Sequence, residues 1–481
     1  MRESLTHIWF YGVHIGYRFG LPFEYPHSRD GLHQQIGKYL QEFHLDLHAR
    51  EIILYGVKNS RATRSLRNWH DLASFHNAIN DFSNKMSGAK ADLWLTLHRL
   101  GHQQVPYFER ANSDYIGRHW LLFRQASMAG LLESAFGLTA FEYMLLVAGV
   151  YTVYLQRPEA NLEVELGSLG LPPAALKARI ASLASTAQAV RDRLTAGHRL
   201  DTSWAYTFNH LVETPLLRLR SDSPDALFCP RPPLVVRRLL AGAYFDLVRT
   251  AGFPKAFGDA VESVVGELLQ RVGPALMVEK PNPYTTGGGV RHGSDWRVSD
   301  ATGQVFVECK SARIPLQAQI ALVPNDVVAG MSRLAAAITQ NYSNISDALA
   351  GKTDWLNDGR PVFSLVVTLE DWILFSPLSS DALDKQVREG VAGKGLPAAL
   401  VDQVPYIVVP VNDLPDLTDA MSLRGCGPLL TKKSSSKYRQ YQMAPFLNEV
   451  EPELQAKSEP FLEEKRDLFA EFERRFKRTG H

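Results

Sequence analysis

The spacing of hydrophobic residues differs between the two halves of the chain. From about residue 65 to about residue 210, apolar side chains recur at intervals of three and four residues, which predicts helices. Beyond about residue 275 the interval becomes two, and short β-branched runs bounded by Pro, Asp and Asn predict strands. These runs are ALMVEK, SDWRVS, QVFVECK, PVFSLVVTLE and YIVVPVND, and the segment VVAGMSRLAAAITQNY predicts a helix between the third run and the fourth.

Other segments are predicted from local signals. The runs IWFYGVHIGY and REIILYGV, within residues 1–58, indicate short strands. The segment LPPAALKARIASLASTAQAVRDRLTAG predicts one helix, because it opens with prolines and stops at a glycine. Residues 214–233 gather prolines and mark a boundary or a crossing loop, followed by two predicted helices, VRRLLAGAYFDLVRTAG and FGDAVESVVGELLQRVG.

The chain ends in an amphipathic segment that predicts a helix capped by Ser458. Its apolar side chains lie along one side, which we expect to pack onto the body of the protein. They are Phe461, Leu468, Phe472 and Phe476.

Together these elements predict a helical part followed by an α/β part. We expect a mostly α-helical N-terminal domain over residues 1–225, an α/β domain over residues 226–450 and a C-terminal amphipathic helix over residues 451–481. At 481 residues the chain is long enough for two or three domains. The order helix, hairpin, helix and strands in the second part is typical of an α/β core.

Composition restricts the kind of partner. Lys plus Arg number 52 and Asp plus Glu 51, a net charge of +1, so a nucleic-acid surface would need locally clustered basic residues. The three cysteines are far apart and form no CxxC pair, which favours a reducing cytoplasm over a disulfide framework. The first residues lack the pattern of a signal peptide, and the most apolar segment, residues 140–155, is shorter than a bilayer span. We therefore expect a cytoplasmic protein that does not enter a membrane.

The candidate chemistry lies in GSDWRVSDATGQVFVECKSARIP, residues 293–315. If residues 300–303 form the turn of a hairpin, alternation of side chains puts the apolar residues on one face of the two strands. The other face then carries Asp295, Arg297, Glu308 and Lys310. The same register predicts three cross-strand pairs, Trp296 with Val307, Val298 with Val305, and Asp295 with Glu308.

Two carboxylates that face each other repel unless a cation lies between them. Carboxylate oxygens suit Mg²⁺, with Mn²⁺ as an alternative, and Lys310 would orient or deprotonate a water beside the metal. Asp295 and Glu308 are therefore predicted metal ligands of a site that hydrolyses phosphodiesters. A solvated hairpin, in which the acids pair with Arg297 and Lys310, is the structural alternative.

These residues resemble the signature of the PD-(D/E)XK nuclease superfamily. In that family an acid begins the second core strand, where this chain has Ser294-Asp295, and an (D/E)-X-K triplet follows in the third, here Glu308-Cys309-Lys310. Serine replaces the family's proline and removes no ligand. The likeness covers roughly residues 250–412.

The resemblance implies a restriction-endonuclease-like core, a mixed sheet flanked by helices, and an Mg²⁺-dependent endodeoxyribonuclease. It adds Glu262, with Glu267 as the alternative, as a metal-site residue on the preceding helix, and Gly266 would let that helix approach the sheet closely. It also implies Gln340 on the following helix. Many relatives act on DNA in restriction, repair or bacterial defence, and such a role is expected here.

Basic residues near the hairpin are candidate contacts to nucleic acid. In the loop TTGGGVRHG these are Arg291 and His292, and Arg297 and Arg313 flank the triplet. The segment TKKSSSKYRQYQ, residues 431–442, interleaves Lys432, Lys433 and Lys437 with tyrosines, which suits a nucleic-acid backbone and its bases. It could instead be a solvated loop.

Other functions remain open from the sequence. A nucleic-acid-binding or scaffold protein could keep the fold without turnover, and a ribonuclease on the same fold would leave no distinguishing motif. Cleavage of both DNA strands would favour a homodimer, and the helical part suits a regulatory partner. His44 and His48, four residues apart on a helical spacing, lack an evident third metal ligand and are read as packing or surface residues.

Overall fold

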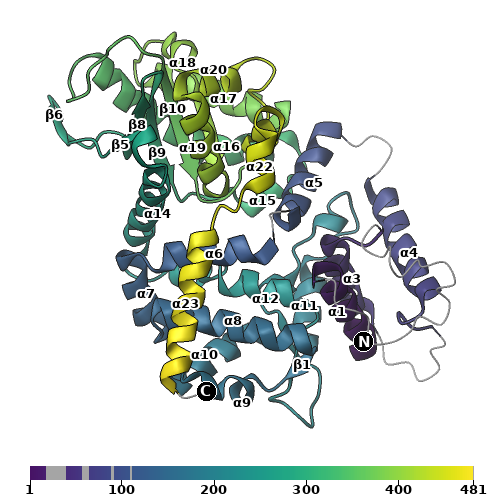
Figure 1. Cartoon of the computed structure of the whole chain (residues 1–481). Helices are drawn as coiled ribbons and strands as arrows, with labels where there is room; N and C mark the ends of the chain where they lie inside the picture. Colours follow the sequence, from purple (N-terminus) through teal and green to yellow (C-terminus); the bar gives the residue numbers. More distant parts are fainter. Residues whose placement is uncertain (18–38, 57–63, 88–91, 109–110, 480–481) are drawn as a thin grey trace.

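The computed structural model describes residues 1–17, 39–56, 64–87, 92–108 and 111–479, and Figure 1 shows their arrangement. Helices form most of the first half. They are α1 (Arg2–Tyr17), α3 (Glu42–Tyr55), α4 (Trp69–Ser87), α5 (Leu93–Phe108), α6 (Ala111–Phe123), α7 (Ala126–Phe136), α8 (Ala140–Gln156), α9 (Leu162–Glu165), α10 (Pro173–Leu183) and α11 (Ala187–Gly197). Four short strands join them in one sheet of order β1-β4-β3-β2, and these are β1 (Glu159–Ala160), β2 (Ala184–Thr186), β3 (Leu216–Arg218) and β4 (Leu227–Phe228).

The second half is a five-stranded sheet with helices on both faces. Its helices are α12 (Pro232–Leu239), α13 (Ala243–Leu247), α14 (Phe253–Gln270), α15 (Leu316–Gln319), α16 (Pro324–Leu349), α17 (Pro377–Gly393), α18 (Leu400–Gln403), α19 (Leu414–Arg424), α20 (Cys426–Ser434), α21 (Met443–Val450), α22 (Pro452–Lys457) and α23 (Leu462–Thr479). Its strands are β5 (Met277–Glu279), β8 (Trp296–Asp300), β9 (Gly303–Lys310), β10 (Val362–Thr368) and β11 (Tyr406–Pro410), while β6 (Tyr284–Thr286) and β7 (Gly289–Arg291) form a separate hairpin.

The sheet is mixed, with the strand order β11-β10-β9-β8-β5. The pairs β5–β8 and β8–β9 are antiparallel, whereas β9, β10 and β11 run parallel. Side chains on one face pack with α14, α19 and α20, and those on the other face pack with α16 and α17. The prediction of a mixed sheet flanked by helices, preceded by a mostly helical region, is confirmed at this level.

The β8–β9 hairpin has the predicted register. Trp296 pairs with Val307 and Val298 with Val305. The turn is held by Asp300, whose Oδ1 accepts hydrogen bonds from the backbone N–H groups of Thr302 and Gly303 at 2.7 and 2.9 Å. The period of two and the Asp-X-Thr-Gly turn were therefore sufficient to place the strands.

The face that carries the charges is not a polar surface, which corrects one part of the prediction. Phe306, on the same face as Glu308, is buried in a second apolar core with residues of α16 and α17. Both faces of the hairpin are covered, because β9 is the central strand of the sheet. The charged residues consequently lie at the end of β9 rather than along its length.

The predicted strands within residues 1–58 are helices instead. Leu5, Ile8 and Tyr11 of α1, and Leu45 and Ala49 of α3, are buried in one apolar cluster. Their separations of three and four residues match the helical period, which outweighs the local content of β-branched and aromatic residues.

The segment predicted as one helix over residues 171–197 is interrupted. Residues 184–186 form β2, which pairs in parallel with β3, and Thr186 then caps a new helix by accepting a hydrogen bond from the backbone N–H of Ala189. Residue 225, the predicted end of the helical domain, lies just before β4. Strand β4 pairs with both β1 and β3, and one apolar core continues from α6 through α14 to β9.

The C-terminal amphipathic stripe packs onto the body, as predicted, with α23 lying across α6 (Figure 1). Phe461 and Leu468 are buried, and Phe472 contacts the ring of Phe141, while the side chain of Phe476 lies outside the described residues. Ser458 does not cap this helix, because α23 begins at Leu462 and the Ser458 hydroxyl donates to Asp416.

In the described part of the chain, no single helix has both the length and the apolar character to cross a membrane. The pair α7 and α8 satisfies the length and composition together, but the two helices are bent by 66° at their junction.

Gly266 fixes how closely α14 approaches the sheet. A Cβ built there would lie 2.2 Å from Cζ2 of Trp296, and the indole is held because its Nε1 donates to the carbonyl of Glu262 at 3.1 Å. We predict that Gly266→Ala lowers the free energy of unfolding by about 1–3 kcal/mol, because the core must shift to admit the methyl group.

Gly258 on the same helix is the matched control, since its added Cβ would meet nothing within 4 Å. Gly258→Ala should be neutral or stabilise by up to about 1 kcal/mol through helix propensity. Urea unfolding of both variants measures the difference, and equal stabilities would contradict the close packing of α14 on Trp296.

Candidate metal and phosphodiester site

The candidate site lies where β9 ends and β8 begins, at one edge of the sheet. Asp295 directly precedes β8, and Glu308 and Lys310 occupy the last residues of β9. Asp295 Oδ2 accepts a hydrogen bond from the backbone N–H of Cys309 at 2.7 Å, which fixes the carboxylate beside the triplet. Lys310 Nζ donates to Glu308 Oε1 at 2.6 Å. The hairpin register therefore brings these three side chains together.

Glu308 is the most constrained of them. It is 1% exposed, and one of its oxygens, Oε2, is buried without a hydrogen-bond partner among the described residues. Burial, and secondly the charge of Asp295, raise the pKa of the carboxyl to about 7, although Lys310 acts in the opposite direction. A buried carboxylate oxygen without a donor is unfavourable, so Glu308 is a group that a cation or a proton would stabilise.

Asp295 shares this environment. Burial raises its pKa, and the charge of Glu262 acts in the same direction. The Cys309 N–H and the ammonium of Lys310 oppose the increase. Asp295, Glu308 and Glu262 thus form one set of mutually repelling carboxylates.

Glu262 of α14 lies close enough for its charge to act on Asp295, and it forms an ion pair with Lys280. Lys280 Nζ lies 2.5 Å from Glu262 Oε1 and 5.7 Å from the centroid of the Trp296 ring. The hydrogen bond to Glu262 raises the pKa of Lys280. Sequence reasoning missed Lys280, although it directly follows the strand run ALMVE and could have been found as the cation after β5.

Glu267, the alternative to Glu262, points elsewhere. Its Oε2 lies 2.8 Å from Arg124 Nη2, and its Oε1 accepts a hydrogen bond from Gln125 at 2.5 Å. Both partners lie at the junction of α6 and α7. The structure therefore favours Glu262 over Glu267 as the acid of α14 near the hairpin.

The carboxylate oxygens of the site are of the chemical type that binds a hard divalent cation, but their arrangement in the structure does not form a complete metal site. Oxygen ligands, mutual repulsion and the unpartnered Glu308 Oε2 suit Mg²⁺ or Mn²⁺. However, the described residues contain no group of three or more His, Cys, Asp and Glu side chains arranged around a common point. Asp295 and Glu308 would supply two ligands, and Glu262 would have to leave Lys280 to supply a third.

Among the predicted nucleic-acid contacts, two arginines are already engaged inside the protein. Arg297 is 8% exposed and forms ion pairs with Glu279 at 2.9 Å and with Asp354 at 2.8 Å. Arg313 lies 3.5 Å from Glu370 and 4.4 Å above the ring of Tyr244. These positions disfavour a direct contact to nucleic acid by either residue.

Arg291, the last residue of β7, and His292 directly after it are both exposed. Arg291 Nη1 lies 3.0 Å from Asp347 Oδ2 on α16, and no contact joins it to the carboxylates of the site. Gln340 is also exposed on α16, and the neighbouring Asn341 is the residue that turns inward, donating to the carbonyl of Phe306 at 3.0 Å. Gln340 was predicted to be a residue of the site, whereas the structure places it on the outer side of the helix.

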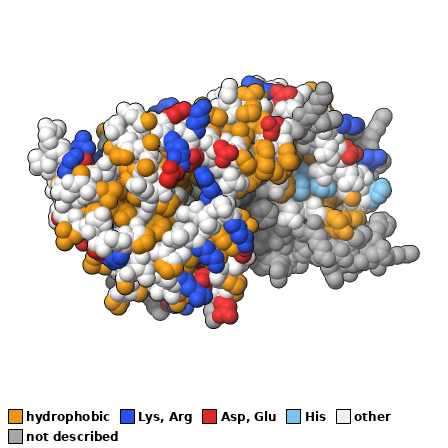
Figure 2. Space-filling view, turned by 90° about the horizontal axis from the view of Figure 1, so that it is seen from above, with side chains coloured by type: hydrophobic (Ala, Val, Ile, Leu, Met, Phe, Trp, Pro, Cys, Tyr) orange, Lys and Arg blue, Asp and Glu red, His pale blue; other side chains and the backbone are white. Residues whose placement is uncertain are grey.

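The segment of residues 431–442 is ordered, with its first residues in α20. Lys432 is exposed, whereas Lys437 lies 2.6 Å from Glu449. Lys433 is 5% exposed and donates to the carbonyls of Tyr438 and Arg439, so it is not a surface contact. Across the face seen in Figure 2, Lys and Arg side chains lie among acidic and apolar ones rather than in one basic patch.

The helical region closes the edge of the sheet beside Lys310. The Lys310 carbonyl accepts a hydrogen bond from the backbone N–H of Leu369 at 3.1 Å, and Arg118 of α6 donates to the Leu369 carbonyl at 3.3 Å. Arg118 is 1% exposed and also donates to Asn412 Oδ1 at 3.0 Å. No local sequence signal could have identified Arg118, because its partners lie some 250 residues away or more.

His44 and His48 lie on α3 and contact His76 of α4. His48 Nε2 and His76 Nδ1 are 3.2 Å apart, and His76 Nε2 is bonded to Asn80. Burial is the largest cause that lowers the pKa of all three imidazoles. They form a packed aromatic cluster, in agreement with the structural reading of the pair.

Comparison of the chain with protein-family models, with curated proteins and with solved structures gave no match.

The buried carboxyl of Glu308 makes the stability of the protein depend on pH. Because its pKa is raised from 4.5 to about 7, the folded state binds this proton more tightly than the unfolded chain does. The free energy of unfolding should therefore fall as the pH rises between these two values. Glu308→Gln removes the ionisation and should stabilise the protein above pH 7 by on the order of 3 kcal/mol.

The stabilisation by Glu308→Gln should vanish near pH 4, where the Glu308 carboxyl of the wild type is largely protonated in both the folded and the unfolded protein. Urea unfolding in EDTA from about pH 4 to about pH 8 measures it. A variant that is less stable than the wild type at the upper pH would show that Lys310 outweighs the burial of the charge.

Proposed function

We propose that the protein is a metal-dependent nuclease that hydrolyses phosphodiester bonds, with DNA as its substrate. The observation that carries the proposal is the buried carboxylate of Glu308, with one oxygen unpartnered, beside Asp295 and Lys310 at the edge of the sheet. A charged triad at the end of an otherwise apolar central strand has no role in packing. It is an arrangement suited to polarising a phosphate and activating a water.

The order of the elements supports the same conclusion. Helix α14, the antiparallel strands β5, β8 and β9, helix α16 and the parallel strand β10 follow one another in the second half of the chain. This order agrees with the restriction-endonuclease-like core that the signature residues imply. The likeness in sequence rests on side chains, and the order of elements rests on backbone pairing.

Each residue then has a distinct task. Asp295 and Glu308 would hold Mg²⁺, which supplies a Lewis acid for the phosphoryl oxygen and lowers the pKa of a bound water. Lys310 would exchange its hydrogen bond to Glu308 for one to the attacking water. Glu262, released from Lys280, would complete the set of oxygen ligands. Backbone N–H donation from Cys309 keeps Asp295 oriented during these changes.

One observation favours a rival function. Every carboxylate of the site already has a donor, Lys310 for Glu308, Lys280 for Glu262 and the Cys309 N–H for Asp295. A nucleic-acid-binding or scaffold protein on this fold would keep such closed pairs and never bind metal. A ribonuclease would use the same carboxylates, so DNA rather than RNA as the substrate is part of the proposal. The proposal also includes a cytoplasmic location, a role in defence against foreign DNA and a homodimer.

Cleavage of supercoiled plasmid tests the proposal. We expect nicking or linearisation with Mg²⁺ or Mn²⁺, none with EDTA, and a loss of at least about 100-fold in Asp295→Asn and in Lys310→Met, because each removes a group that acts in the transition state. The same protein should be assayed on single-stranded DNA and on RNA. Metal-dependent cleavage that persists in both variants, or binding without cleavage of any substrate, would contradict the assignment.

Glu262 and Glu267 form a matched pair on α14 for a second prediction. Glu262→Gln should lower the cleavage rate at least about tenfold through weaker metal binding, with partial recovery at high Mn²⁺. Glu267→Gln, whose partners are Arg124 and Gln125, should change the rate less than about twofold. Equal effects of the two substitutions would show that α14 contributes stability rather than a ligand.

A further inference from the structure

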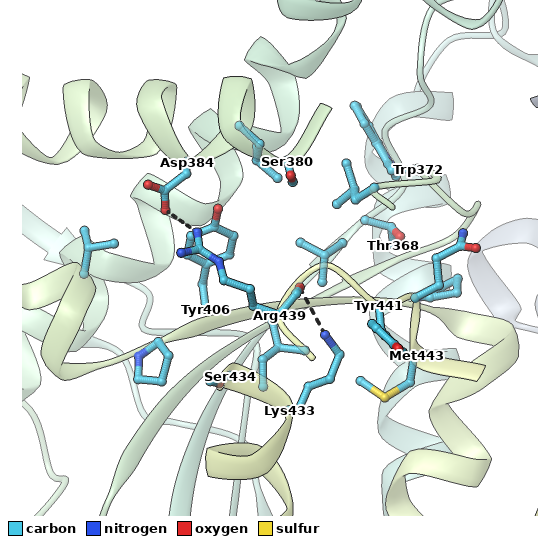
Figure 3. Close-up of a pocket in the computed structure, with 18 of the residues that line it drawn as sticks. Thr368, Trp372, Ser380, Asp384, Tyr406, Lys433, Ser434, Arg439, Tyr441 and Met443 are labelled. Atoms are coloured by element: carbon cyan, nitrogen blue, oxygen red, sulfur yellow. Dashed lines mark hydrogen bonds and ion pairs between the residues drawn. The ribbon is translucent and has the colours of Figure 1, made fainter. Parts of the chain in front are cut away.

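A cavity of about 240 Å³ lies beside the edge strand β11, outside the carboxylate site. Its walls come from α17 and α18 on one side and from α20 and residues 439–443 on the other. Figure 3 shows Arg439 and Lys433 entering from the second side, opposite Asp384 and Ser380 of α17. The volume is slightly below the usual range for small-molecule sites, about 300–1,000 Å³, so it would take one compact ligand.

Lys433 gives the cavity an unmatched positive charge. The residue is 5% exposed, and its ammonium donates to the carbonyls of Tyr438 at 3.1 Å and Arg439 at 3.3 Å. An ammonium has three N–H donors, and among the described residues the two acceptors of this one are backbone carbonyls, with no carboxylate acting on its charge. Burial, and secondly Arg439, lower its pKa to about 8. A bound anion would compensate the positive charge of Lys433, whose burial is otherwise unfavourable.

Each acidic residue of the wall already has an ion-pair or hydrogen-bond partner. Asp384 and Asp402 both bind Arg388, at 2.9 and 2.7 Å. Asp371 accepts hydrogen bonds from the backbone N–H of Ile373 and from Gln442, each at 2.8 Å. The donors left over are therefore those of Lys433 and of Arg439, whose contact with Asp384 is long, at 3.5 Å, and whose side chain is 51% exposed.

The wall also offers aromatic surface and a second unused donor. Tyr406, Tyr441 and Trp372 line the cavity. Trp372 is 1% exposed, and its indole Nε1 is buried with no acceptor in the described structure. Aromatic rings beside cationic groups suit a ligand that combines a flat heterocycle with an anion.

The cavity and the carboxylate site lie on neighbouring strands of the sheet. Thr368, a wall residue, is the register partner of Lys310 on the neighbouring strand, and paired residues of adjacent strands are about 5 Å apart. If a phosphate of a nucleic-acid chain lay at Lys310, the cavity would therefore lie beside the neighbouring strand of the sheet, β10.

We propose that the cavity binds one nucleoside phosphate, with the phosphate against Lys433 and Arg439 and the base against the tyrosines. The choice of a nucleotide over another anion rests on the proposed nuclease function. Two sources share this chemistry, an unpaired nucleotide of the substrate strand and a free nucleotide. Either one would contact Lys433, Arg439 and Tyr441, the residues of the segment 431–442 with basic or aromatic side chains in the wall.

Calorimetric titration with 2′-deoxyadenosine 5′-monophosphate in EDTA tests the cavity without any cleavage. We expect binding to the wild type, a rise in Kd of at least about tenfold in Arg439→Ala and in Lys433→Met, and no change in Lys385→Ala. Lys385 is the matched control, because it lies on α17 with a side chain 76% exposed and outside the wall. No binding to the folded wild type at millimolar nucleotide, or equal binding by all variants, would overturn the proposal.

Cleavage of a labelled single strand then separates the two sources. If a nucleotide of the strand fills the cavity, the monophosphate inhibits competitively and Arg439→Ala raises KM; if a free nucleotide fills it, KM stays unchanged. Asp295→Asn should keep the nucleotide affinity while losing cleavage. Nucleotide binding by a protein that cleaves nothing would uphold the cavity and refute the nuclease, so the two failures are distinguishable.

Discussion

The burial of one carboxylate at the end of the central strand is the constraint on which this structure depends. Glu308 lies in the central strand β9, where residues 303–309 are all buried, with an oxygen that has no donor in the described chain and a second acid beside it. Such a group destabilises the folded protein at neutral pH unless a cation accompanies it. Lys310 compensates part of this unfavourable burial. The part that Lys310 leaves uncompensated is the basis on which we propose a metal.

Two parts of the surrounding structure hold the candidate site in place, α14 and the backbone that follows β10. Gly266 lets α14 lie against Trp296, which brings Glu262 toward Asp295. The backbone of Leu369 bonds Lys310 on one side and Arg118 of the helical region on the other. The helical half is therefore part of the frame of the candidate site rather than a separate module, and the continuous apolar core between the halves has the same consequence.

The sequence was sufficient where the interactions are local. A period of two, a turn led by Asp300 and the Glu-X-Lys triplet together gave the register of the hairpin and the approach of Asp295 to Lys310. A helical spacing placed Glu262 and Gly266 on the side of α14 that faces the sheet. These features depend on residues within about 50 positions of one another, so pattern and geometry determine them.

What the sequence could not give depends on long-range contacts. The burial of Arg297 follows from acids on β5 and after α16, and that of Lys433 from the fold of the segment after α20. Neither could be distinguished from a surface residue by spacing alone. The N-terminal runs are helices rather than the predicted strands because the three-residue spacing of Leu5, Ile8 and Tyr11, which buries all three, outweighs the aromatic and β-branched content of the runs.

The central claim is that a divalent cation joins Asp295 and Glu308. A crystal soaked in Mn²⁺ tests it directly, because the anomalous difference map locates the ion without reference to activity. The account predicts one strong peak in contact with Glu308 Oε2 and a carboxylate oxygen of Asp295, with Lys310 turned away from Glu308. A map without a peak at these oxygens, with the Lys310–Glu308 pair intact at saturating Mn²⁺, would contradict it.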